Sequence, residues 1–320
     1  MSPRLVFMGT APLAAVSLEA LVRQPAFQIV AVATQPDRPK GRELKPQPSA
    51  VKETAQRLYL PVLQPERARA EEFTRELTQF QPDLIVVVAY GQILPASILE
   101  LPRYGCLNVH TSLLPKYRGA APIQWALLNG DATTGVTIMK MDATLDTGPI
   151  LSQESLSILP EDNASSLHDR LAQLGADLLV RTLPDYLGGA IVPRPQPTAG
   201  ACYARKITKE DGRIDWQASP ETLATRLRGL TPWPGLYTYL PTLPKPTLLK
   251  IWAVQAAEQG QGEPGTVLRA DKEGIVVACG PGALRILALQ REGARRLAAR
   301  DFLAGHPLRP GNHFLPNVEP

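Results

Sequence analysis

Asn108 and His110 stand two residues apart at the end of a predicted strand, residues 105–109. Because side chains alternate along a strand, both project from the same face. A side-chain amide beside an imidazole can stabilise the oxyanion that forms when a nucleophile attacks a carbonyl group. Asp146 follows another predicted strand, residues 135–141, and its carboxylate could orient His110 or take part in proton transfer. Taken singly, each residue is more often a hydrogen-bonded core residue or a turn former.

The first 189 residues alternate between apolar strand patterns and amphipathic helical patterns. Continuous apolar strands separated by such helices are typical of a parallel sheet that is covered on both faces. Ligands bind such sheets at the carboxyl ends of the strands, where Asn108, His110 and Asp146 are expected to lie. The strands are predicted at 5–8, 29–33, 84–89, 105–109 and 135–141, and the helices at 14–21, 66–80, 119–129 and 166–187.

The chain changes character after residue 189. Residues 190–204 are rich in proline and show no periodicity, so we predict a semi-rigid linker there. Short strand patterns separated by glycine and proline follow, which favours a small β-barrel. These strands are predicted at 248–254, 265–269, 274–278 and 283–289. The sequence therefore predicts an α/β domain over residues 1–189 and a mostly β domain over residues 205–320.

Composition and missing motifs disfavour several classes of protein. The first strand-to-helix turn, residues 9–12, lacks GxGxxG, and GxxxxGK[ST] does not occur. These absences disfavour a nicotinamide oxidoreductase and a P-loop NTPase. The three cysteines are isolated, so we expect neither disulfides nor a metal site. No apolar stretch approaches the ~18 residues of a membrane span, and we expect a cytoplasmic protein.

The charges are unevenly distributed along the chain. Residues 1–204 carry 18 Lys and Arg against 19 Asp and Glu, whereas residues 205–320 carry 16 against 11. The basic excess of the second part suggests a polyanionic partner. A mildly basic domain without such a partner fits the charge count equally well.

Two segments around the candidate catalytic residues resemble the active-site signature of the 10-formyltetrahydrofolate-dependent formyltransferases. They are NVHTSLLPKYRGAAPIQ (108–124) and GVTIMKMDATLDTGPIL (135–151). Shorter similar pieces are FMGT, TQPDRPKGR, VVVAYGQILP, RIDW and PWPG, so the resemblance covers nearly the whole chain. It implies a Rossmann-like catalytic domain followed by a C-terminal barrel that resembles an OB-fold.

The resemblance also implies roles for particular residues. Asn108, His110 and Asp146 match the central polar residues of the family, and formyl transfer by these three residues would require no metal. The co-substrate would be 10-formyltetrahydrofolate, bound beside residues 90–94 and the loop 142–146. The residues predicted to contact it are Tyr90, Gly91, Gln92, Ile93, Leu94, Ser112, Leu113, Leu114, Pro115 and Asp142.

The acceptor implied by the resemblance is the α-amino group of methionine on the initiator tRNA. The proline-rich loop 36–48 would enter the acceptor stem, with Arg42 matching the key arginine of the family. Glu43 and Leu44 depart from the small or basic residues usual after it. The residues predicted to contact tRNA are Arg38, Lys40, Arg42, Lys45, Lys206, Lys209, Arg295 and Arg296. The alternative for the C-terminal cations is a solubilising face.

Two other functions remain open at this level. One is a folate-dependent formyltransferase that acts on a sugar amine or on glycinamide ribonucleotide with the same three residues. The other is an RNA-binding protein whose N-terminal domain has lost catalysis. The basic C-terminal part argues against the first, and the intact Asn108, His110 and Asp146 argue against the second. We expect a monomeric transferase of translation initiation that acts on methionyl initiator tRNA.

Overall fold

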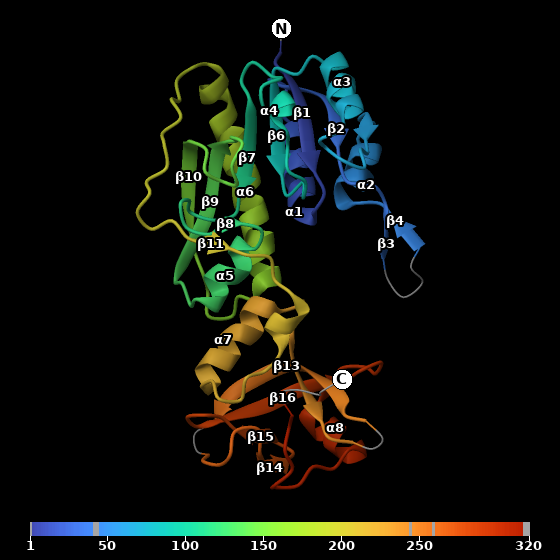
Figure 1. Ribbon diagram of the computed structural model, residues 1–320, viewed down its shortest axis with the longest axis vertical. Helices are drawn as coiled ribbons and strands as arrows, with labels where there is room; N and C mark the ends of the chain where they lie inside the picture. The colour runs from blue at the N-terminus through green and yellow to red at the C-terminus, as the bar shows by residue number, and fades with distance from the viewer. Residues whose placement is uncertain (1, 41–44, 243–244, 258–259, 316–320) are drawn as a thin grey trace. The chain divides into compact units, whose positions relative to one another are not determined.

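The computed structural model describes residues 2–40, 45–242, 245–257 and 260–315 (Figure 1). The chain divides into two compact units, each with its own core. The first unit comprises Met1–Ile123, Ala132–Ile158 and Leu167–Arg205, and the second comprises Gln124–Asp131, Leu159–Ser166 and Lys206–Pro320.

The first unit is built on a seven-stranded sheet with the order β10-β9-β7-β6-β1-β2-β5. Five strands are parallel, as the apolar runs predict, but β9 is antiparallel to β7 and β10 is antiparallel to β9. The sheet is therefore mixed, and the prediction of a wholly parallel sheet is wrong for its last two strands. The strands are β1 (Arg4–Gly9), β2 (Gln28–Ala33), β5 (Val62–Leu63), β6 (Leu84–Val88), β7 (Cys106–His110), β9 (Thr133–Lys140) and β10 (Ile150–Ser157).

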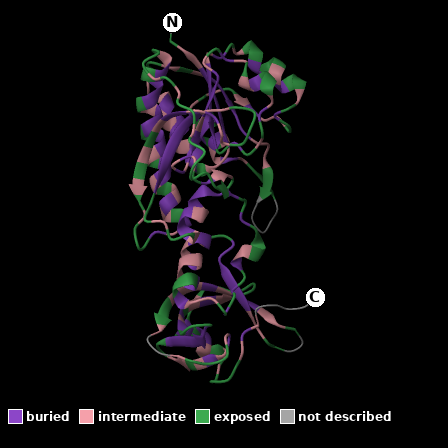
Figure 2. Cartoon of the chain, turned by 60° about the vertical axis from the view of Figure 1, so that its left-hand side comes forward, coloured by how far each residue is buried: buried purple, intermediate pink, exposed green. Residues whose placement is uncertain are grey.

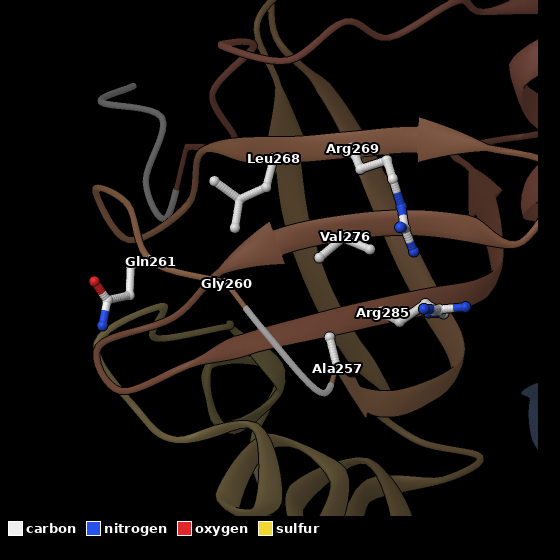
Figure 3. Close-up of a pocket in the computed structure, with 7 residues that line it drawn as sticks. All are labelled: Ala257, Gly260, Gln261, Leu268, Arg269, Val276 and Arg285. Carbon is white, nitrogen blue, oxygen red and sulfur yellow. The ribbon is translucent and has the colours of Figure 1, made fainter.

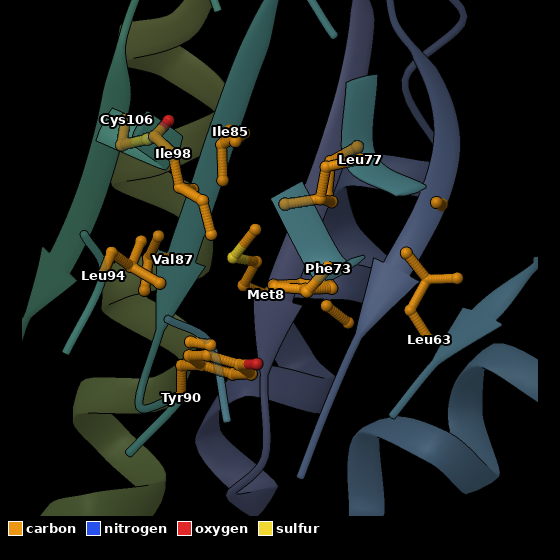
Figure 4. Close-up of a cluster of buried hydrophobic side chains, with 14 of the residues drawn as sticks. Met8, Leu63, Phe73, Leu77, Ile85, Val87, Tyr90, Leu94, Ile98 and Cys106 are labelled. Carbon is orange, nitrogen blue, oxygen red and sulfur yellow. The ribbon is translucent and has the colours of Figure 1, made fainter. Parts of the chain in front are cut away.

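Helices cover both faces of this sheet. On one face, Phe73 and Leu77 of α3 pack with the central strands, and the thiol of Cys106 lies against the carbonyl of Ile98 of α4 (Figure 4). On the other face, α6 packs closely enough that a Cβ at Gly175 would lie 3.0 Å from Val109. The central strands are consequently buried (Figure 2). The helices of this unit are α1 (Pro12–Val22), α2 (Ala50–Arg57), α3 (Glu71–Gln79), α4 (Ala96–Leu99) and most of α6 (Ala164–Leu187), whereas most of α5 (Pro122–Leu128) belongs to the second unit.

Two small strand pairs complete the first unit. β3 (Arg38–Lys40) and β4 (Lys45–Gln47) form an antiparallel ribbon within the predicted loop 36–48. β8 (Arg118–Gly119) pairs in parallel with β11 (Tyr203–Ala204). Residues 190–204, for which the sequence predicts a linker, thus belong to the first unit and hydrogen-bond to its loops.

The second unit contains one antiparallel sheet with the order β12-β13-β16-β15-β14, and β17 pairs with β16. Trp216 stacks on Phe314 in its core, with ring centroids 5.9 Å apart. Among the described residues the two edge strands do not pair with each other, so an OB-like barrel stays a prediction. The elements are η1 (Lys209–Gly212), α7 (Pro220–Leu230), β12 (Leu236–Leu240), β13 (Thr247–Ala257), β14 (Val267–Asp271), β15 (Gly274–Ala278), β16 (Ala283–Arg291), β17 (Leu297–Ala298) and α8 (Ala299–Gly305).

The three cysteines are expected to differ sharply in reactivity. Burial raises the pKa of the Cys106 thiol to about 12 and that of Cys279 to about 11, whereas Cys202 is exposed. Because the thiolate is the nucleophile, the two buried thiols stay protonated at pH ~8. A colorimetric thiol reagent should therefore titrate one thiol in the native protein and three in denaturant. A native Cys202→Ser variant that still reacts would contradict this.

Candidate active site

The end of β7 carries Asn108 and His110 on one face of the sheet, opposite Met139 and Thr137 of β9. The His110 side chain is only 6% exposed. Its Nε2 atom lies 2.9 Å from the backbone oxygen of Tyr117. Because a carbonyl oxygen can only accept, Nε2 carries the hydrogen of this bond. Nδ1 is therefore the ring nitrogen that remains for another group.

Asp146 reaches the same place by a route that the sequence did not predict. The loop 141–149 leaves β9, which runs antiparallel to β7. It begins at the end of β7 away from His110, where the N–H of Met141 donates to the oxygen of Cys106 at 2.8 Å. The loop then folds back to bring Asp146 beside the end of β7. The expected proximity is present, although the parallel-strand argument for it was wrong.

The Asp146 carboxylate is held by contacts on both of its oxygens. The side-chain amide of Asn108 donates to Oδ1 at 3.4 Å, and the backbone N–H of Gly119 donates to Oδ2 at 2.8 Å. Nδ1 of His110 lies 3.7 Å from Oδ2. The Asp146 backbone has a φ of 53°, in the left-handed region that L-residues rarely adopt. The structure thus brings the three predicted residues together, and their catalytic roles stay a prediction.

The predicted folate-contacting residues 112–115 fold against the sheet. The hydroxyl of Thr137 donates to the oxygen of Ser112 at 2.6 Å and accepts from the N–H of Leu114 at 3.1 Å. The side-chain amide of Gln153 donates to the oxygen of Leu114 at 2.8 Å. Because the Ser112 and Leu114 side chains are buried, any folate contact from these two residues would come from their backbone.

A cavity of about 120 Å³ lies between residues 92–94 and the loop 141–149. Ile93 and Leu145 are large apolar side chains on its rim and are 81% and 51% exposed. A cavity edged by such side chains suits a flat, partly apolar ligand. Four of the residues named as folate contacts line it, as does the rest of the predicted loop 142–146, whereas Met139 and Met141 were not predicted. The lining residues are Gln92, Ile93, Leu94, Met139, Met141, Asp142, Ala143, Thr144, Leu145 and Asp146.

Tyr90 and Gly91, also predicted at the folate site, are not among these lining residues. The Tyr90 ring packs in the core of the first unit (Figure 4), and its burial raises the pKa of the phenol to about 12. Its backbone oxygen accepts from the Thr10 hydroxyl and the Gln35 amide, both at 2.9 Å. Tyr90 therefore anchors the segment whose next residues line the cavity.

Family models match both parts of the chain. The formyl transferase model matches residues 4–183, and the model of the formyl transferase C-terminal domain matches residues 206–307. The chain belongs to the formyl transferase family. The family predicted from the two signature segments is therefore confirmed.

Curated relatives resemble this formyl transferase along nearly its full length. A methionyl-tRNA formyltransferase of Geobacter metallireducens is 50% identical over 307 residues, which are 96% of this chain and 97% of the relative. A methionyl-tRNA formyltransferase of Myxococcus xanthus is 49% identical over 310 residues, 97% of each chain.

Solved structures of more distant proteins share the fold. HypX from Aquifex aeolicus, in complex with tetrahydrofolic acid, has a TM-score of 0.64 at 16% identity, over 95% of this chain and 47% of that one. An N-formyltransferase from Helicobacter canadensis, in complex with folinic acid and dTDP-3-aminofucose, has a TM-score of 0.64 at 19% identity, over 90% of this chain and 99% of that one. At such identities the likeness concerns the fold alone.

The cations predicted to contact tRNA lie on both units of this formyl transferase. Arg38, in the β3–β4 ribbon, forms an ion pair with Glu66 at 3.6 Å, and Lys45 is exposed. Arg42, Glu43 and Leu44 lie outside the described residues. In the second unit, Lys206, Lys209 and Arg295 are exposed, and the guanidinium of Arg296 lies 5.3 Å from the Trp252 ring centre.

The described part of this formyl transferase offers neither a metal centre nor a membrane-spanning helix. It contains no group of three or more His, Cys, Asp or Glu side chains that could hold a metal ion. Within the same residues, no helix combines the length and the apolar character needed to cross a membrane.

Proposed function

We propose that this formyl transferase moves the formyl group of 10-formyltetrahydrofolate to the α-amino group of methionyl initiator tRNA, giving formylmethionyl-tRNA. The observation that carries the chemistry is the convergence of Asn108 and His110 on Asp146, which lines the cavity. The acceptor is supported by relatives about 50% identical over 96–97% of the chain that are methionyl-tRNA formyltransferases. We also propose that the enzyme is a monomer of the cytoplasm, a reducing compartment in which its three cysteines stay free.

The three side chains would divide the work of acyl transfer. The amine nitrogen attacks the formyl carbon, and the bond from that carbon to N10 of the folate breaks. The Asn108 amide, together with Nδ1 of His110 when protonated, would donate to the oxyanion of the tetrahedral intermediate. Asp146 would accept the amine proton, which ends on N10, and would stabilise the imidazolium.

The folate would lie in the cavity beside the loop 141–149. Residues 92–94 supply one wall, and the exposed Ile93 and Leu145 offer apolar surface to a ring system. Backbone groups of residues 90–94 and 112–115, with Asp142, would complete the predicted contacts. This placement puts the N10-formyl group next to Asn108, His110 and Asp146.

The second domain, residues 205–320, would bind tRNA through an OB-like barrel. The segment 313–315 supports such a barrel because it bridges Thr266, just before β14, and Tyr239 of β12. Four of the predicted cations lie in this domain, namely Lys206, Lys209, Arg295 and Arg296. A hollow of about 560 Å³ on its sheet adds Arg269 and Arg285 (Figure 3). Arg269 of β14 is paired with Asp271 at 3.0 Å, and Arg285 lies on β16, which β15 separates from β14.

The function is tested by incubating the protein with 10-formyltetrahydrofolate and methionine-charged initiator tRNA. Formylmethionine released by deacylation is the expected product. Uncharged initiator tRNA and charged elongator tRNA serve as controls and should give little or none. A dTDP-amino sugar and glycinamide ribonucleotide run beside them, and transfer to either in place of the charged tRNA would overturn the proposed acceptor.

Binding of tRNA should weaken steeply with salt because phosphate contacts release counterions. If the four predicted cations of the second unit each contact a phosphate, raising the salt from about 50 to 200 mM weakens binding by about 50-fold or more. Fluorescence anisotropy with labelled initiator tRNA measures this. Replacing Lys206, Lys209, Arg295 and Arg296 with alanine should flatten the slope, whereas replacing Arg23 and Arg75 should not. Equal slopes in both variants would contradict the assignment.

A further inference from the structure

Gln196, in the proline-rich segment after α6, contacts both loops that form the candidate active site. Its Nε2 donates to the backbone oxygens of Asp146 at 2.9 Å and Gly148 at 2.8 Å. Its Oε1 accepts from the guanidinium of Arg118, at 3.1 Å from Nε and 2.8 Å from Nη2. The side chain thereby joins the Asp146 loop, residues 141–149, to the Arg118 loop, the segment 111–119 that follows His110.

The partners of Gln196 fix the orientation of its amide. Backbone oxygens only accept and a guanidinium only donates, so the nitrogen must face the loop and the oxygen must face Arg118. Both N–H groups and both lone-pair directions of the oxygen are then occupied. A glutamate could keep the bonds to Arg118, but it would place a carboxylate oxygen against the two carbonyl oxygens.

The position of Asp146 depends on this contact for a geometric reason. Its loop begins at the far end of β7 and folds back, and its φ of 53° is unfavourable for an L-residue. The Gly119 N–H restrains the carboxylate, while Gln196 restrains the backbone of the same residue. Arg194 adds a β-bridge to Ile150 at the end of the loop. The segment 194–196 is therefore a strap across the Asp146 loop.

We propose that Gln196 is a positioning residue for formyl transfer, which acts by fixing the backbone of Asp146 against the Arg118 loop. The inference rests on the proposed function, because it assigns Gln196 a role only if Asp146 takes part in the chemistry. Gln196 touches no reacting atom. Its loss lets the carboxylate shift relative to Asn108 and His110, and a displacement of about 1 Å can cost roughly 10²-fold in rate.

The first test compares Gln196→Ala and Gln196→Glu with Gln173→Ala. Gln173 is an exposed glutamine of α6 whose side-chain amide donates to Asp177, and its replacement should leave turnover unchanged. Formylation of charged initiator tRNA is measured with turnover expressed per tetrahydrofolate-binding site. Both Gln196 variants should lose roughly 10- to 100-fold in kcat, with KM changed less than about threefold. A Gln196→Glu variant with normal kcat would overturn the proposal, because it lacks the donors to the loop.

The second test asks whether Gln196 acts through Asp146. On an Asp146→Asn background, Gln196→Ala should cause no further loss of kcat, because coupled residues are non-additive. If Gln196→Ala lowers kcat as much on the Asp146→Asn background as it does alone, the inference is overturned. It is also overturned if Gln196→Ala lowers only the number of folate-binding sites and leaves kcat per site unchanged. If Asp146→Asn itself keeps normal turnover, the proposed function of the site fails. If Asp146→Asn is impaired and Gln196→Ala is normal, only the role of Gln196 fails.

Discussion

Asp146→Asn should lower kcat for formylation by roughly 10²- to 10⁴-fold, the range of a general acid–base contribution. The new amide has nearly the shape of the carboxylate, but it carries no charge and cannot accept the amine proton. If its oxygen turned toward the Gly119 N–H, its NH₂ group would face the Asn108 amide, which now donates to the carboxylate at 3.4 Å. Single-turnover formylation of charged initiator tRNA measures the effect.

The matched control for this experiment is Asp185→Asn. Asp185 is an exposed aspartate of α6, and its replacement should leave kcat within about twofold, since isolated surface substitutions have small effects. Binding of tetrahydrofolate should be preserved in both variants, because asparagine keeps nearly the shape of Asp146 in the cavity lining and Asp185 is not a lining residue. Normal turnover of Asp146→Asn, with the folate site intact, would show that the convergence of the three residues has no catalytic meaning.

Gly148→Ala should damage both stability and activity. A Cβ at Gly148 would lie 1.8 Å from the backbone oxygen of Lys140, so the hairpin between β9 and β10 would have to open. We expect the free energy of unfolding to fall by about 3 kcal/mol or more, as for other substitutions that force a backbone to shift. The Asp146 loop would move with it, and kcat should fall by roughly 10²-fold. Urea denaturation and the formylation assay measure the two effects.

Gly305→Ala provides the comparison for Gly148→Ala. Gly305 ends α8, a Cβ there would meet no heavy atom within 4 Å, and its φ lies outside the left-handed region. The same chemical change should therefore alter stability by less than about 1 kcal/mol, and it could stabilise by reducing the entropy of the unfolded chain. Equal midpoints for Gly148→Ala and the wild type would contradict the predicted clash.

The elements of the first unit follow closely from local sequence pattern. The apolar runs at 5–8, 29–33 and 84–89 fall within or largely coincide with β1, β2 and β6. Burial on both faces demands a continuous apolar run, so such strands are visible without knowledge of their neighbours. The placement of Asn108 and His110 on one face required only the two-residue period of a strand.

Local sequence pattern could predict neither the direction of the strands nor the closure of a barrel. An antiparallel β9 has the same local pattern as a parallel one, because direction is set by the path of the connecting chain and by the choice of partner. The barrel predicted for residues 205–320 poses the same problem, since it depends on how the edge strands are bridged. The described edge strands do not pair directly, and the segment 313–315 reaches both.

The positions of individual side chains were likewise only partly predictable from the sequence. Tyr90 and Ile93 were both predicted at the folate site, but the Tyr90 ring lies in the core, so only its backbone is left for a folate contact, whereas Ile93 lines the cavity. Gln196 carries no motif and stands in a stretch that looks like a linker. In the sequence, Gln196 is separated from Gly148 by 48 residues, from Asp146 by 50 and from Arg118 by 78. A polar side chain whose hydrogen-bond partners are so distant in the sequence produces neither a periodic pattern nor a local motif.

By itself, the sequence determined the family, the candidate Asn108–His110–Asp146 set and most of the buried strands, because motif spacing and hydrophobic periodicity are local properties. Only the tertiary structure decided that β9 runs antiparallel, that the Asp146 loop folds back over β7, and that Gln196 binds this loop to Arg118. These features depend on which distant backbone and side-chain groups meet. Contacts between groups that are distant in the sequence depend on the path of the connecting chain and on the requirement that buried polar groups form hydrogen bonds.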